Sequence, residues 1–184
     1  MLQSRAAFYL MAFFSVFIAL TSYRFLFIGL PLSCQGMEGQ IDNILFSFVV
    51  HFSLAPLALL LGVIQFSSKI RAKKPVLHRW SGRIYGVAIL LAGAAGFSIA
   101  LTSAGGMVAA VGFALLACVW IFTTVLGIQY ARARRFVEHR RWMVRSFALT
   151  LAGVTLRLQL LFFMLSGVEY TEASVFLAWT CWIP

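Results

Sequence analysis

Two histidines beside arginines are the residues of this sequence best placed to do chemistry. His78 lies in LHRWSGRIY and His139 in HRRWMVR, each just before an apolar run. Two imidazoles at one depth on two membrane helices could supply both axial ligands of one b-type haem. Each histidine is also expected in the first turn of its helix, where exposed N–H groups and neighbouring arginines could bind an anion such as a lipid phosphate. Both interpretations remain open on the sequence.

His51 and Arg157 are expected inside apolar segments that contain no Asp or Glu. An arginine within the bilayer costs roughly 3 kcal/mol or more unless it is paired or hydrated. Arg157 therefore needs backbone carbonyls, Gln159, water, or a group from outside the chain, such as a haem propionate, a quinone oxygen or a lipid phosphate. His51 could bond a serine or a carbonyl, ligate haem, or contact a quinone. A two-haem protein is disfavoured, because Leu116 occupies the repeat position that matches His51.

Several kinds of catalytic site have no counterpart in the sequence. There is no H-E-x-x-H, no G-x-S-x-G, no glycine-rich phosphate loop and no pair of carboxylates, so a hydrolase is disfavoured and no catalytic residue is assigned. Cys34, Cys118 and Cys181 form no C-x-x-C pair, which predicts neither a disulfide framework nor a metal site. Whether the protein is an enzyme at all, for example an electron-transfer component, stays open.

Composition and charge assign the chain to the membrane class. Of its 184 residues, 62% are hydrophobic and 11% are charged, whereas a soluble domain is nearer one quarter charged. The net charge of +10 comes mostly from two clusters between apolar runs: Lys69, Arg71, Lys73, Lys74, Arg79 and Arg83, and Arg132, Arg134, Arg135, Arg140, Arg141 and Arg145. This is the positive-inside pattern of a multi-pass protein, and it argues against a nucleic-acid partner.

Five apolar stretches are long enough to cross a bilayer, which takes about 20 residues. They are residues 7–30, 44–66, 84–104, 107–130 and 146–167. A partial sixth segment, 174–184, is too short to span and is expected to be an outer cap or the start of a longer helix. We predict a single all-α polytopic membrane bundle over residues 1–184. The basic connections 67–83 and 131–145 and the N-terminus are expected on the cytoplasmic side, and Arg24 is expected to reach toward Glu38 or Asp42 on the other side.

Residues 44–104 and 107–167 read as a duplicated helical hairpin. LGVIQF precedes the first His-Arg-Trp stretch and LGIQY precedes the second, and an arginine follows each tryptophan by three residues. Such repeats are expected to be related by an axis along the membrane normal. We therefore predict that His78 and His139 face each other, with haem propionates or lipid phosphates countered by nearby side chains. The candidate lipid- or anion-binding residues are Arg79, Arg83, Arg140, Arg141, Arg145, Trp80 and Trp142.

Helical spacing places small and polar residues on one face of each of three segments. The members are His139, Trp142, Ser146, Thr150, Gly153 and Arg157; His78, Gly82, Tyr85, Ala92, Gly96 and Ser103; and Ser47, His51, Gly62 and Gln65. Membrane helices turn such faces toward one another, because small side chains allow close approach and polar ones bond across the interface. These three faces are therefore predicted to line the inside of the bundle.

The stretch LHRWSGRIY together with HRRWMVRSFALTLAGVTLR resembles a widespread family of uncharacterised bacterial multi-pass membrane proteins, a domain of unknown function. The resemblance covers residues 51–184. It implies a compact helical bundle in the bacterial inner membrane and no established activity. Members usually continue beyond CWIP, which implies that the last helix is longer than the segment seen here.

Two functions are compatible with these features. The first is a small redox component that carries one b-type haem or contacts quinone through His78, His139, His51 and Arg157. The alternative is a non-enzymatic lipid-binding helical subunit, or an assembly factor, packed in a larger membrane complex. Its partners would be membrane lipids with anionic head groups and other membrane subunits.

Overall fold

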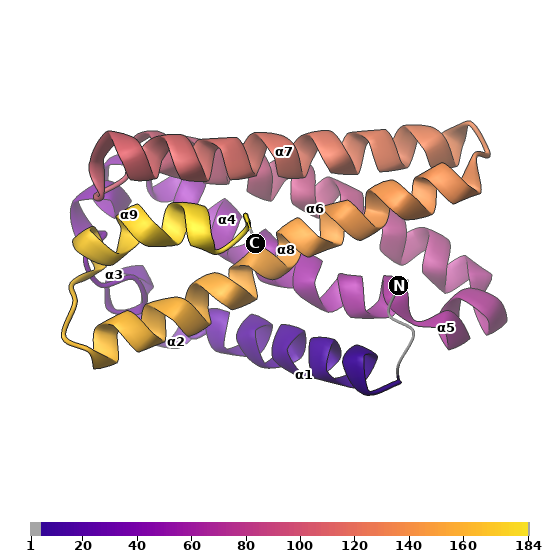
Figure 1. Ribbon diagram of the computed structural model, residues 1–184, viewed down its shortest axis with the longest axis horizontal. Helices are drawn as coiled ribbons and strands as arrows, with labels where there is room; N and C mark the ends of the chain where they lie inside the picture. The colour runs from indigo at the N-terminus through magenta and orange to yellow at the C-terminus, as the bar shows by residue number, and fades with distance from the viewer. Residues whose placement is uncertain (1–4, 184) are drawn as a thin grey trace.

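The computed structural model describes residues 5–183 as a set of packed helices, and that part of the chain contains no strand (Figure 1). The long helices are α1 (Arg5–Ser22), α4 (Glu38–Phe66), α6 (Pro75–Leu101), α7 (Gly106–Arg132) and α8 (Phe136–Leu165). The short helices are α2 (Phe25–Ile28), α3 (Leu30–Ser33), α5 (Ser68–Lys73) and α9 (Tyr170–Thr180). Five stretches, of which the first joins α1 and α2, are long and apolar enough to cross a membrane. The prediction of an all-α polytopic bundle is confirmed.

Two of the predicted spans begin too late. Helix α6 starts at Pro75 and α8 at Phe136, so most of 67–83 and 131–145 is helix rather than connecting loop. Proline favours the first helical position, because its missing N–H would be unpaired there anyway. Hydropathy marks where a helix meets hydrocarbon, and these two helices continue beyond that point with charged residues. The true connections are α5 with its flanking residues and the three residues after Arg132.

The other predicted boundaries also change at the end of the bundle that holds α2, α3 and α9. The predicted first span, 7–30, breaks after Ser22 into α2 and α3, around Gly29 with its φ of 78°. Helix α4 starts at Glu38 rather than at residue 44, where Ile44 leaves helical geometry at a φ of −135°. The partial sixth segment starts at Tyr170 and forms the 11-residue helix α9 (Tyr170–Thr180). We call this the capped end and the opposite one, with α5 and the starts of α6 and α8, the basic end.

The long helices form a closed ring of neighbours. Helix α4 packs on α6, α6 on α7 and α7 on α8, while α8 also contacts α1 and α4. Figure 1 shows α8 running diagonally between α7 at one edge of the bundle and α1 at the other. The cap α9 lies against α7 and α8. This ring encloses one interior into which α4, α6, α7 and α8 all send side chains.

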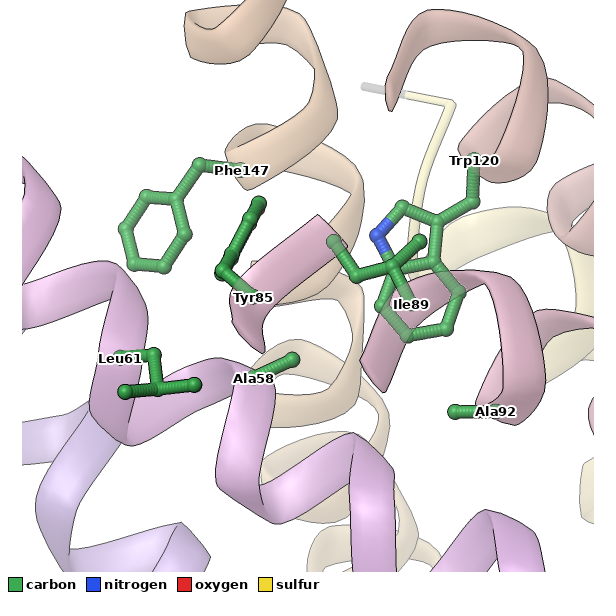
Figure 2. Close-up of a cluster of buried hydrophobic side chains, with 7 residues drawn as sticks. All are labelled: Ala58, Leu61, Tyr85, Ile89, Ala92, Trp120 and Phe147. Atoms are coloured by element: carbon green, nitrogen blue, oxygen red, sulfur yellow. The ribbon is translucent and has the colours of Figure 1, made fainter. Parts of the chain in front are cut away.

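The main core cluster lies where the two hairpins meet. It consists of Ala58, Leu61, Tyr85, Ile89, Ala92, Trp120 and Phe147 (Figure 2). The Phe147 ring of α8 stacks on Phe66 with 4.7 Å between centroids. It also fills the space beside Gly62 of α4, where an added Cβ would lie only 1.9 Å from the ring. Only glycine fits at position 62 while this ring stays in place.

We predict that Gly62→Ala destabilises the protein by about 1–3 kcal/mol, because the new methyl group must displace the Phe147 ring from a packed core. Thermal unfolding in detergent measures the loss. Gly39→Ala is the matched control, since a Cβ there meets nothing within 4 Å. Combining Gly62→Ala with Phe147→Leu should recover part of the loss. Equal melting temperatures for the two single variants would contradict this account of the packing.

Candidate functional site

A cluster of hydroxyl groups occupies the middle of the bundle and joins α6, α7 and α8. The Tyr85 hydroxyl lies 3.2 Å from Ser146 Oγ and 3.1 Å from Thr150 Oγ1. Trp120 Nε1 donates to Thr150 Oγ1 at 2.9 Å, and Thr124 Oγ1 lies 2.7 Å from Ser146 Oγ. All five residues are buried. A buried polar group without a partner is costly, so this mutual pairing ties the three helices together.

The predicted polar faces account for part of that cluster. Tyr85, Ser146 and Thr150 belong to the faces predicted for α6 and α8, and the structure brings them into contact. Trp120 and Thr124 were missed, because they stand in an α7 sequence that is apolar on all sides. Their only sequence signal is that Trp and Thr each need a partner when buried. In Figure 2, Tyr85 lies between Phe147 and Trp120.

His78 lies in the first turn of α6, at the basic end of the bundle. Its backbone N–H donates to Lys74 O at 3.1 Å, which is the first helical hydrogen bond of α6. Its side-chain Nδ1 is buried without a hydrogen-bond partner in the described part of the chain. Gln65 of α4 takes the neighbouring groups instead, donating to His78 O at 2.9 Å and to Ser81 Oγ at 2.6 Å. The imidazole is therefore left with an unused polar atom.

His139 occupies the matching place at the start of α8 but is bonded differently. Its N–H donates to Arg135 O at 2.9 Å, as that of His78 does to Lys74. Its Nδ1 lies 2.8 Å from the carbonyl oxygen of Gly127 on α7. The fourth residues of α6 and α8 therefore make equivalent backbone hydrogen bonds, but only the Nδ1 of His139 has a partner among the described residues. The duplication itself remains a prediction.

Each His-Arg-Trp stretch continues into an arginine stacked on the tryptophan. The guanidinium of Arg83 lies 4.7 Å from the ring of Trp80, and that of Arg145 lies 4.5 Å from the ring of Trp142. Attraction between a cation and an aromatic face contributes about 0.5–1 kcal/mol at exposed sites. Trp80 is 58% exposed, whereas Trp142 packs edge-on against Phe122. Each arginine is thus held about one turn after the tryptophan of its own helix.

The basic end carries an excess of exposed positive charge. All twelve basic residues of the two clusters are exposed, including Arg79, Arg140 and Arg141. Among residues 5–183 the one ion pair joins Arg135 to Glu138 at 2.7 Å. A hollow of about 180 Å³ lies beside α5, lined by Lys69, Ile70, Lys73, Lys74 and Leu77. This combination of ammonium and aliphatic groups suits a phosphate joined to hydrocarbon.

Arg157 lies on α8 toward the capped end. One of its guanidinium nitrogens, Nη1, donates to Gly153 O at 3.1 Å, so backbone carbonyl was correctly among its predicted partners. Gln159 is bonded to Thr180 of α9 instead, with the Thr180 hydroxyl donating at 2.9 Å. Helix α8 starts ten residues before the predicted span, and Arg157 lies in its second half, eight residues before Leu165. Its expected depth near the middle of the membrane remains a prediction.

His51 and Arg24, the other polar groups expected toward the capped end, each bond a backbone carbonyl. His51 Nδ1 lies 2.9 Å from Ala92 O on α6, which agrees with the expectation of a carbonyl partner. Burial raises the pKa of the Cys34 thiol to about 11, and the Arg157 guanidinium opposes part of that rise. Arg24 donates to Ser33 O at 2.7 Å, so its expected approach to Glu38 or Asp42 is wrong. The cause is the turn into α2 and α3, which folds Ser33 back against Arg24.

The described residues include no group of three His, Cys, Asp or Glu side chains that could hold a metal ion. A second hollow of about 490 Å³ lies between α8 and α9, lined by Leu158, Gln159, Phe162, Phe163, Phe176 and Thr180. Neither hollow borders His78 or His139.

Comparison with known proteins places the chain in a family. No curated protein and no solved structure matches the sequence significantly. Residues 48–184, which include both His-Arg-Trp stretches, the hydroxyl cluster and Arg157, match a family of unknown function. The chain therefore belongs to the family described as "Predicted membrane protein (DUF2306)".

Proposed function

We propose that this integral membrane protein is a non-enzymatic helical subunit that binds anionic lipid head groups at its basic end. The observation that carries the proposal is the repeated pairing of an arginine with a tryptophan, Arg83 on Trp80 and Arg145 on Trp142. Tryptophan favours the membrane–water interface, where its ring fits between head groups and hydrocarbon. An arginine stacked on such a ring is held at the depth of the lipid phosphates.

The charge of the basic end supports the same proposal. Each Lys or Arg near an anionic membrane surface contributes about 1 kcal/mol of attraction. The cations that line the hollow beside α5 have Ile70 and Leu77 next to them, so a head group could bind there while its acyl chains follow the apolar side chains. The positive-inside rule favours a cytoplasmic position for this end and for the start of α1, in a bacterial inner membrane. Other membrane subunits would then contact the lipid-facing helix surfaces.

We predict that Arg83→Gln/Arg145→Gln weakens binding of phosphatidylglycerol about 30-fold, because two contacts of about 1 kcal/mol each are lost. The measurement titrates phosphatidylglycerol into phosphatidylcholine nanodiscs that hold the protein and follows thermal stabilisation. Arg5→Gln/Arg132→Gln is the control, since it removes two exposed charges of the same end that stack on no aromatic ring. An equal loss of affinity in the two double variants would contradict a specific role for the arginine–tryptophan pairs and would indicate nonspecific attraction between charges. The difference should shrink at high salt, which screens exposed charges.

A redox function is the second candidate, and one observation favours it. His139 has its Nδ1 fixed by the Gly127 carbonyl, whereas the buried Nδ1 of His78 has no partner in the described chain. A carbonyl at Nδ1 is the usual way in which a protein orients a ligating imidazole and leaves Nε2 free. One b-type haem would be held by these two residues, with Arg83 and Arg145 near its propionates. A quinone contact would instead use His51 and Arg157.

The redox candidate predicts a visible spectrum that depends on both histidines. Protein purified from a haem-replete host should show a Soret band that shifts on reduction with dithionite. His78→Ala and His139→Ala should each abolish that band, while Gln65→Ala, which changes only a neighbour of His78, should retain it. A colourless wild-type preparation that also fails to take up added hemin would reject haem binding and leave the lipid-binding proposal unaffected.

A further inference from the structure

An amide and a hydroxyl group are paired on the outer surface of the bundle, at the seam between α8 and α9. The Thr180 hydroxyl donates to Gln159 Oε1 at 2.9 Å, and Gln159 Nε2 donates to the Thr180 carbonyl oxygen at 3.3 Å. Both hydrogen bonds are exposed. A glutamine side chain has two N–H donors and an oxygen with two lone pairs. One N–H and one lone pair of Gln159 therefore have no hydrogen-bond partner within residues 5–183.

The position of Gln159 along α8 makes these unused groups costly. It lies six residues, roughly 9 Å, before the end of α8 at Leu165. Exposed apolar side chains flank it along the helix, since Leu158 precedes it and Leu161 and Phe162 follow it. In a membrane protein such a band of exposed side chains meets hydrocarbon, which offers no partner to an amide. A partner with both a donor and an acceptor at this depth would remove that cost.

The surface around this pair is hollowed. Helix α9 lies against α8 there (Figure 1), and the hollow of about 490 Å³ between them is lined by Gln159, Thr180 and otherwise only apolar side chains. Two of these, Phe162 and Phe176, are 68% and 60% exposed. Phe163 stacks on Phe176 with 6.2 Å between ring centroids, which joins the two helices. The surface thus combines exposed rings with a space that can hold one.

Membrane topology limits which partners can match such a surface. Two copies of one chain are inserted in the same orientation, so a two-fold axis that relates them runs along the membrane normal. Each residue then meets the other copy at its own depth, and a side chain beside the axis must pair with itself. The amide of Gln159 can do so, because its free N–H matches its free lone pair. A lysine or an arginine at such a place would repel its own copy.

We propose that the α8–α9 surface is the contact between two copies of this chain, with Gln159 of each copy donating to Gln159 Oε1 of the other. Phe162 of each copy fills the hollow of the other. No charged residue lines the hollow, so the contact desolvates no ion. Polar side chains that bond across helices favour association in membranes, where apolar contact alone gains little over contact with lipid. The contact does not involve the basic end, so it does not depend on lipid binding there.

The test measures the oligomeric state of the purified full chain. Light scattering in a neutral detergent and energy transfer between labelled copies in phosphatidylcholine vesicles should both show a dimer. We expect Gln159→Leu to raise its dissociation constant about tenfold, because the amide pair is lost. Gln129→Leu is the matched control and should leave the dimer unchanged, since it removes an exposed amide of α7 that does not line the hollow.

A second variant keeps the proposal testable if Gln159→Leu loosens α9. Phe162→Ala leaves the hydrogen bonds between Gln159 and Thr180 in place and should also weaken the dimer. Its control is Phe46→Ala, which removes an exposed ring of α4 and should have no effect. Arg83→Gln/Arg145→Gln should dimerise like the wild type, so the failure of this proposal and of lipid binding at the basic end can be recognised separately.

Cross-linking locates the contact. In a Cys118→Ser background, which removes the exposed thiol, Leu158→Cys should form a disulfide between two copies on mild oxidation. Leu20→Cys, at an exposed position of α1, should not. A monomer in both detergent and vesicles, with or without lipid bound in the hollow, would overturn the proposal. A dimer that neither Gln159→Leu nor Phe162→Ala weakens, or that cross-links through Leu20→Cys and not through Leu158→Cys, would also overturn it.

Discussion

The hydroxyl cluster around Tyr85 is the interaction on which the arrangement of the bundle depends. Between membrane helices there is little hydrophobic driving force, because lipid tails are as apolar as the side chains they would replace. Tyr85 of α6 reaches Ser146 and Thr150 of α8, and α7 joins through Trp120 and Thr124. These bonds connect the first hairpin to the second. The positions of His78 and His139 follow from them, since each lies seven residues, or two turns, before a member of the cluster.

Charge divides the molecule into two chemically different ends. At the basic end, many exposed cations surround two arginine–tryptophan pairs, which suits a loose, salt-sensitive association with many head groups. Toward the capped end, the arginines are few and each bonds a backbone carbonyl, Arg157 that of Gly153 and Arg24 that of Ser33. The charge that can orient the protein in a membrane is therefore concentrated at the basic end.

The sequence predicted the helical class, the number of spans and the polar faces that meet inside the bundle, because each depends on hydropathy and on helical spacing alone. It misplaced the starts of α6 and α8, since hydropathy reports the depth of the hydrocarbon and not the end of a helix. The break into α2 and α3 was missed, although Gly29 and Pro31 lie within it. The different partners of His78 and His139 were beyond prediction. They depend on Gln65 and Gly127, which other parts of the chain bring into place.

The close contacts of α8 with two glycines limit how this helix can move against its neighbours. Phe147 of α8 fills the space at Gly62 of α4, and Met143, one turn earlier, lies where a Cβ of Gly127 on α7 would be, 2.4 Å from its sulfur. A side chain that packs against a glycine of the next helix resists sliding of the two helices along their axes, because the neighbouring positions carry larger residues. Helix α8 is therefore held in register with both α4 and α7. Transporters that alternate between two openings need one half to rock against the other. We therefore expect a lipid bound to this bundle to change its tilt or its neighbours in the membrane before its internal shape.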